Sequence, residues 1–109
     1  MEIRQISPQQ LKQRLDNGDD LFILDVREPH EWEISNLGRY DAVLIPKRRV
    51  LERLGELDRG REIVVQCRSG QRSSTVIREL TPLGFNNLWN LDGGINRWVR
   101  EIDPSMTLY

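Results

Sequence analysis

The chain has 109 residues, of which 38% are hydrophobic, so it is long enough to bury the core of one domain and too short for two. Its 16 basic and 17 acidic residues leave a net charge of −1, which excludes a global attraction to nucleic acid or to an anionic membrane. We therefore expect a single domain over residues 1–109 that binds neither nucleic acid nor membrane.

Cys67 is the only cysteine of the chain and His30 is the only histidine. A lone cysteine excludes an internal disulfide, and neither residue has a partner at metal-ligand spacing, so we expect no metal site and no cofactor. The first residues contain no apolar segment typical of a signal peptide, and the apolar run at residues 21–24 is too short to cross a bilayer. These features predict a cytoplasmic protein, which we expect to be a monomer.

The N-terminal part of the chain predicts a strand, a helix and a second strand. Residues 3–6 are a short strand candidate, and Ser7 is a typical N-cap residue, with Gln10 placed to complete a capping box. Gly18 ends that helix, and residues 21–24 form a continuous apolar strand of the kind that is buried on both faces of a parallel sheet.

The rest of the chain continues the alternation of helices and strands. Apolar spacing predicts helices at residues 29–34, 50–57 and 73–80, and a last helix with an apolar face from Ile95 to Ile102. Strands are predicted at residues 42–45, 63–66 and 87–91. Five strands with intervening helices predict a three-layer α/β domain with a mainly parallel sheet.

In such sheets, ligands bind beyond the carboxyl ends of the strands. The segments predicted to lie there are Asp25 to Arg27, Cys67, and Asp92 with Gly93 and Gly94. We expect Asp25 and Arg27 to support the site structurally, because an aspartate after a strand often caps a turn or pairs with a nearby arginine. The glycine pair after Asp92 lacks the longer dinucleotide fingerprint, so it indicates backbone geometry rather than phosphate binding.

Cys67 ends an apolar strand and begins a polar loop, so the strand delivers the sulfur to the carboxyl edge. The candidate substrate-binding loop that follows consists of Arg68, Ser69, Gly70, Gln71, Arg72 and Ser73. Backbone N–H groups at the start of the next helix, with two guanidinium groups, favour the thiolate over the thiol and predict a nucleophile. A free cysteine is more often a small buried hydrophobe, but apolar residues usually follow such a cysteine.

Three signatures occur together in the chain: residues 25–28 with Glu31 and Trp32, residues 67–73, and residues 91–95 with Trp98. Together they resemble the rhodanese (sulfurtransferase) family, and most of all the rhodanese domains attached to ubiquitin-activating-like adenylyltransferases. The resemblance implies a rhodanese-like fold in which Cys67 carries a sulfane sulfur as a persulfide. It also implies that the backbone amides of residues 68–72 wrap that persulfide, with Gly70 as the flexible point.

The resemblance further implies a sulfurtransferase of the thiosulfate sulfurtransferase type. Such an enzyme moves sulfur from thiosulfate or a protein persulfide to a thiophilic acceptor, so its partners are a small donor, or a sulfur-carrier or desulfurase protein. Many members of the family have a Gly-His-Ile sequence after the Glu-aromatic pair, whereas this chain has no histidine there. We therefore expect no histidine to act at the site, and the sequence leaves the conformation of residues 35–41 open.

Other functions remain open for the same residues. A thiol-based redox or interaction module would oxidise an exposed thiolate reversibly. A rhodanese-like phosphatase or arsenate reductase needs a wider anion-binding loop than the four residues that separate Cys67 from Arg72. Arg68 and Arg72 either steer an anionic donor or an acidic partner, or are ordinary solvated arginines. The short loop favours one extra sulfur over a phosphoryl group, so sulfur transfer is our main hypothesis.

Overall fold

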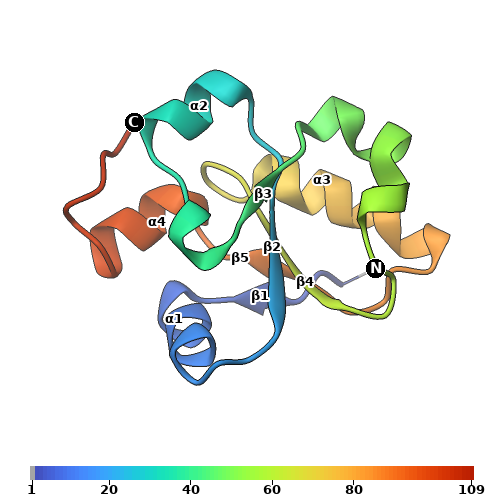
Figure 1. The fold of residues 1–109 in the computed structure, drawn as a ribbon, viewed down its shortest axis with the longest axis horizontal. Coiled ribbons are helices and arrows are strands. Elements are labelled where there is room, and N and C mark those ends of the chain that lie inside the picture. Colours follow the sequence, from blue (N-terminus) through green and yellow to red (C-terminus); the bar gives the residue numbers. More distant parts are fainter. Residues whose placement is uncertain (1) are drawn as a thin grey trace.

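Five parallel strands form one sheet at the centre of the molecule (Figure 1). The computed structural model describes residues 2–109, so Met1, which the single-domain prediction includes, lies outside the described residues. The strands follow the order β1-β5-β4-β2-β3. They are β1 (Gln5–Ile6), β2 (Leu21–Asp25), β3 (Val43–Leu44), β4 (Glu62–Gln66) and β5 (Leu88–Leu91). Every neighbouring pair is parallel, which confirms the predicted sheet.

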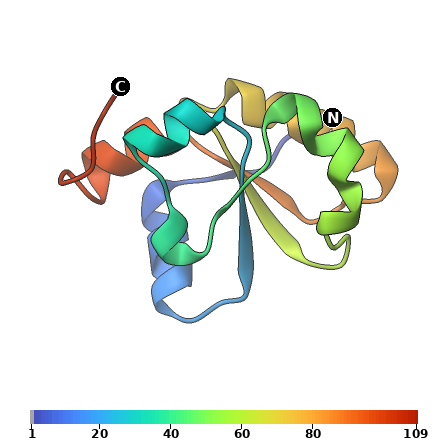
Figure 2. The same cartoon turned by 45° about the horizontal axis from the view of Figure 1, so that its top comes forward.

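Helices cover both faces of the sheet and complete the predicted three layers (Figures 1 and 2). The α-helices are α1 (Pro8–Asp16), α2 (Pro29–Ile34), α3 (Gln71–Leu80) and α4 (Gly94–Glu101), and the 3-10 helices are η1 (Gly38–Tyr40), η2 (Lys47–Glu56) and η3 (Thr81–Leu83). Helices α1 and α4 lie on one face, whereas α3 and η2 lie on the other. No helix within residues 2–109 has the length and apolar content to cross a bilayer.

The side chains of β4 alternate between two apolar cores, as the period of two residues in a strand requires. Ile63, Val65 and Cys67 belong to the core under α3 and η2, whereas Val64 belongs to the core under α1 and α4. Both cores are needed because both faces of a parallel sheet are buried. Cys67 therefore leaves the sheet on the α3 side, next to the start of that helix.

The start and the end of α1 confirm the sequence prediction. The Ser7 hydroxyl accepts a hydrogen bond from the Gln10 N–H at 3.1 Å, and the Gln10 side chain accepts one from the Ser7 N–H at 2.9 Å. This reciprocal pair is the predicted capping box. Gly18 follows the helix with a φ of +79°, a conformation that glycine adopts without the Cβ clash of other residues.

Two helices differ from the sequence prediction. The predicted helix at residues 50–57 is instead the 3-10 helix η2, which starts at Lys47 and is broken by a kink at Arg53. Gly55 disfavours a regular helix there, and Val50 is the only residue of η2 that is fully buried, so packing does not enforce one. Helix α3 begins at Gln71 rather than at residue 73, because Gly70 ends the loop with a φ of +110° and acts as the N-cap residue.

Residues 35–41, whose conformation the sequence left open, turn the chain back toward the sheet. Ser35 is extended after α2, and the 3-10 helix η1 follows. Asp41 ends η1 with a φ of +63° and is the one described residue other than glycine with a positive φ. The turn brings the backbone to β3, which pairs with β2 at the edge of the sheet.

Candidate active site

The sulfur of Cys67 lies directly beyond the carboxyl end of β4, at the N-terminus of α3. It accepts hydrogen bonds from the backbone N–H groups of Gly70, at 3.1 Å, and of Ser73, at 3.4 Å. The Ser73 hydroxyl lies 3.3 Å from the same sulfur. Polar hydrogens therefore face Sγ although the residue is only 1% exposed.

The start of α3 explains why N–H groups face the sulfur. The first hydrogen bond within this helix runs from the Ser74 N–H to the Gly70 carbonyl, so the N–H groups of residues 71–73 precede it. Such groups carry the positive end of the helix dipole and favour a negatively charged neighbour. The Ser73 N–H is the one among them that contacts Sγ. This arrangement stabilises negative charge on the sulfur.

Helix α4 is hydrogen-bonded to the backbone of the cysteine loop. The carbonyls of Cys67 and Arg68 accept hydrogen bonds from the N–H groups of Ile95, at 2.9 Å, and Asn96, at 3.2 Å. Gly94 makes this approach possible, because a Cβ atom at that position would lie 2.2 Å from the Arg68 carbonyl oxygen. With its carbonyls bound to α4, the loop presents N–H groups to the sulfur.

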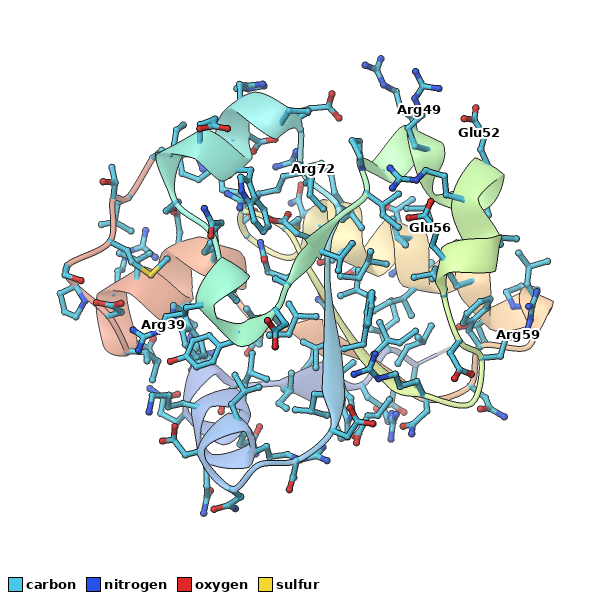
Figure 3. The ribbon with its side chains drawn as sticks, viewed as in Figure 1. Arg39, Arg49, Glu52, Glu56, Arg59 and Arg72 are labelled. Atoms are coloured by element: carbon cyan, nitrogen blue, oxygen red, sulfur yellow. The ribbon has the colours of Figure 1, made fainter. Side chains whose placement is uncertain are left out.

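Arg72 forms an ion pair with Glu31 of α2 instead of pointing freely into solvent. Its two terminal nitrogens donate to the two carboxylate oxygens of Glu31 at 2.7 and 2.8 Å, and Figure 3 labels Arg72 at the start of α3 beside α2. The bidentate contact lowers the pKa of Glu31 to about 2 and raises the pKa of the Arg72 guanidinium. The pair ties α2 to the first turn of α3.

Tyr109 joins this ion pair to a second one. Its hydroxyl donates to Glu31 Oε2 at 2.7 Å and accepts from Arg27 Nη1 at 2.9 Å. The exposed guanidinium of Arg68 lies over the Tyr109 ring, 4.7 Å from its centroid. Tyr109 thus touches the cysteine loop through Arg68 and the support beneath it through Arg27 and Glu31.

Asp25 and Arg27 form an ion pair whose side chains are both fully buried. Arg27 Nη2 donates to Asp25 Oδ2 at 2.6 Å and to the Ser35 carbonyl at 2.8 Å. In the sheet register Asp25 lies beside Gln66, the residue before Cys67. The pair therefore joins the ends of β2 and α2, the geometry that a structural role requires.

The structure confirms that the three predicted segments meet at one edge, since Cys67 lies between the end of β2 and the start of α4. Within the predicted loop, two residues contribute the backbone N–H groups that contact the Cys67 sulfur. Only Gly70 and Ser73 of the predicted loop donate an N–H to Sγ, whereas Ser69 and Gln71 are exposed. Asp92 pairs with Arg97 of α4, at 2.9 Å, on the surface.

Sequence reasoning assigned no role at the site to Glu31, Asn90 or Tyr109. Asn90 carries a signal in retrospect, because it is a polar residue between two apolar residues of β5 and is only 3% exposed. The Ser73 hydroxyl donates a hydrogen bond to its side-chain oxygen. Glu31 and Tyr109 are 78 residues apart, and no local pattern indicates their contact.

The fold and the site together define a three-layer α/β domain that presents one cysteine to helix-start amides at the carboxyl edge of a parallel sheet. The family model described as the rhodanese-like domain matches residues 7–101. The putative sulfurtransferase YtwF of Bacillus subtilis is 36% identical to the chain over 104 residues, which are 95% of this chain and 98% of that protein. The chain belongs to the family of rhodanese-like domains.

Further relatives differ in how much of their length is matched. The probable adenylyltransferase/sulfurtransferase MoeZ of Mycobacterium tuberculosis is 36% identical over 106 residues, which cover 95% of this chain but only 26% of MoeZ. This chain therefore spans about a quarter of that relative. The crystal structure of a rhodanese-related protein from Thermoplasma volcanium has a TM-score of 0.82 and 29% identity, and covers 97% of this chain and 99% of that one.

Proposed function

We propose that this chain is a sulfurtransferase in which Cys67 carries the transferred sulfur as a persulfide. The observation that carries the proposal is the pair of N–H groups on Sγ, from Gly70 at 3.1 Å and Ser73 at 3.4 Å. Family membership and the names of relatives such as YtwF support the class of reaction. A sulfur that is held by donors at a helix start is suited to act as a nucleophile.

The reaction consists of two displacements. The Cys67 thiolate attacks the outer sulfur of the donor, an Sγ–S bond forms, and the donor's S–S bond breaks, so that sulfite or a thiolate leaves with the bonding electron pair. A thiophilic acceptor then attacks the outer sulfur, the persulfide bond breaks, and Cys67 regains its thiolate. Neither step needs a general base, because both leaving groups are stable anions.

Because Cys67 is only 1% exposed, a donor reaches its sulfur only when the loop shifts outward. Gly70 is the flexible point of that movement, since its φ of +110° is a conformation that glycine enters and leaves more easily than other residues.

The donor is a small anion such as thiosulfate, or the persulfide of a desulfurase or a sulfur-carrier protein. The Arg68 guanidinium is the positive charge of the loop that can attract such a donor, because the Arg72 guanidinium is paired with Glu31. The short spacing between Cys67 and Arg72 favours one sulfur atom over a phosphoryl group. A reactive thiol without an internal disulfide partner suits the reducing cytoplasm, where we expect the protein to act as a monomer.

Mass spectrometry of the intact protein tests the proposal. After incubation with thiosulfate, the mass of the wild type should rise by one sulfur atom, and cyanide should remove that atom as thiocyanate. Cys67→Ser should keep the fold, as judged by circular dichroism, and should gain no sulfur. Equal loading of the two proteins would remove Cys67 from the mechanism, and hydrolysis of para-nitrophenyl phosphate would favour the phosphatase alternative instead.

A further inference from the structure

A chain of hydrogen bonds leads from the sulfur of Cys67 to Asn90 in β5. The Ser73 hydroxyl lies 3.3 Å from Sγ, and it donates a hydrogen bond to Asn90 Oδ1. A serine hydroxyl has one hydrogen to donate and lone pairs with which to accept. Ser73 therefore cannot donate to Asn90 and to Sγ at the same time.

The surroundings of Asn90 fix which end of its amide faces Ser73. Its Nδ2 group lies 3.2 Å from the Gly70 carbonyl, which only accepts, and 3.1 Å from Ser74 Oγ. Ser74 uses its own hydrogen for the Gly70 carbonyl at 2.7 Å, so its oxygen accepts from Asn90. The amide nitrogen must therefore face the loop, and the side-chain oxygen must face Ser73. Within residues 2–109, Ser73 is the only donor to that oxygen.

The donor and acceptor roles in these hydrogen bonds depend on the charge of the sulfur. With Cys67 as a thiol, the S–H group donates to Ser73 Oγ and the Ser73 hydroxyl donates to Asn90, so every group has a partner. When Sγ loses its proton, it becomes an acceptor, and the Ser73 hydroxyl then lies between two acceptors. It must either leave Asn90 Oδ1 without a donor in a buried site or leave the sulfur facing an oxygen lone pair.

We propose that Asn90 is a positioning residue that acts on Cys67 through Ser73. The Ser73 hydroxyl is a donor with two positions: it points to Asn90 in the resting thiol and turns to the sulfur when the proton leaves. Asn90 therefore opposes ionisation of Cys67 while it anchors the loop through the Gly70 carbonyl. The catalytic meaning of this switch rests on the proposed sulfur transfer, whereas the switch itself needs no sulfur donor.

The substitution of Asn90 leaves the charged and titratable residues around the loop in the sequence of both variants. They are Asp25 and Arg27 at the end of β2, Glu31 of α2, Arg68 and Arg72 of the loop, Asp92 and Arg97 at the start of α4, and Tyr109. A comparison of two variants that share these groups therefore isolates the effect of the Ser73 hydroxyl on the thiol.

The test is a pH titration of the thiolate by its ultraviolet absorbance, with Cys67→Ser subtracted to remove the tyrosines. Asn90→Ala frees the Ser73 hydroxyl for the sulfur, so the thiolate should form at lower pH, with its equilibrium constant raised about threefold to tenfold. A merely structural role predicts the opposite sign, because a loosened loop would withdraw the Gly70 and Ser73 amides from Sγ. A midpoint that rises or stays the same overturns the proposal.

The matched control is Asn90→Ala in a protein that lacks the Ser73 hydroxyl. In the Ser73→Ala background, Asn90→Ala should leave the thiol midpoint unchanged, because no hydroxyl remains to be released. An equal shift in both backgrounds would show that Asn90 acts without Ser73 and would overturn the proposal.

A measurement on the wild type protects the test against an Asn90→Ala protein that does not fold. The ¹³C resonance of the Asn90 side-chain carbonyl should move with the thiol midpoint as its hydrogen bond is lost, and it should not titrate in Ser73→Ala. A resonance that stays constant across the wild-type midpoint overturns the switch. Failure of sulfur loading from thiosulfate in the intact protein would instead contradict the proposed function and leave the titration result standing.

Discussion

At the scale of single residues, Asp25 and Arg27 form an ion pair in the interior of the protein. Both side chains are fully buried, and Arg27 donates to Asp25, to the Ser35 carbonyl and to Tyr109. A buried carboxylate is tolerated only with such a partner, because desolvation of a single charge costs several kcal/mol. The pair thus fixes the end of β2 next to the cysteine loop.

Arg27→Met removes one partner and leaves the Asp25 carboxylate alone in the interior. We expect the free energy of unfolding to fall by about 3–5 kcal/mol, because an uncompensated buried charge remains. Urea denaturation followed by circular dichroism measures the change. Arg39→Ala is the control, since the Arg39 side chain is 68% exposed and its loss should hardly change stability. A loss for Arg27→Met no larger than for the control would contradict this role.

At the scale of elements, the contact between α4 and the cysteine loop determines which groups face the sulfur. Helix α4 donates its first N–H groups to the loop carbonyls of Cys67 and Arg68. Gly94 has a φ of +64° and leaves no room for a Cβ atom between the helix and the Arg68 carbonyl. The absence of a side chain at Gly94 therefore allows the two backbones to approach closely.

Gly94→Ala tests this packing. We expect α4 to be pushed away from the loop, with a stability loss of about 1–3 kcal/mol and slower sulfur loading, because the added Cβ meets backbone atoms that cannot move aside. Thermal unfolding and the thiosulfate mass assay measure the two effects. Gly55→Ala is a matched control, since a Cβ there meets nothing within 4 Å. Normal loading by a folded Gly94→Ala protein would show that the close approach is dispensable.

At the scale of the whole molecule, one polar network ties together parts of the chain that are far apart in sequence. Asp25, Arg27, Tyr109, Glu31 and Arg72 are connected in that order by hydrogen bonds. The network joins the end of β2, helix α2, the start of α3 and the C-terminal segment. Its charged groups make the stability of the entire domain depend on pH.

Glu31 sets the direction of that dependence. Its pKa falls from 4.5 to about 2 in the folded protein, so the folded state binds its proton less readily than the unfolded state. The resulting stabilisation, about 2–3 kcal/mol, is complete above about pH 5 and is lost as the pH falls from there toward about 2. Glu31→Gln should therefore lose stability at about pH 6 and lose roughly half as much at about pH 3 in urea denaturation.

Glu56→Gln is the control for this experiment. The Glu56 carboxylate also pairs with an arginine, Arg53, at 2.6 Å, but its side chain is half exposed and solvent screens the pair (Figure 3). Its substitution should change stability little at either pH. A pH-independent deficit of Glu31→Gln would assign the effect to packing rather than to charge.

We propose that residues 1–109 fold as one cooperative domain. The first strand, β1, pairs with the last strand, β5, and α1 packs in one core with α4, so neither end of the chain completes a core without the other. Near- and far-ultraviolet circular dichroism should therefore give one coincident unfolding transition in urea. Two separate transitions would contradict a single domain.

Much of the fold could be predicted because its signals are local. The apolar run of β2, the capping box at Ser7 and the glycine after α1 each act within a few residues, and the predicted elements other than the helix at residues 50–57 were found at or near their places. The kinked η2 was not predicted, because apolar spacing alone does not distinguish a 3-10 helix from an α-helix. The start of α3 was placed two residues late, because the sequence does not show the left-handed backbone of Gly70.

The sequence by itself determined the class of the fold, the edge at which Cys67 lies and the helix start behind it, because strand polarity and helix capping follow from neighbouring residues. Only the tertiary structure decided that Arg72 binds Glu31, that Tyr109 contacts Glu31 and Arg68, and that Asn90 faces Ser73. Those contacts join residues separated by 17 to 78 positions. The packing of the layers determines which of these residues meet, and no local pattern in the sequence indicates that packing.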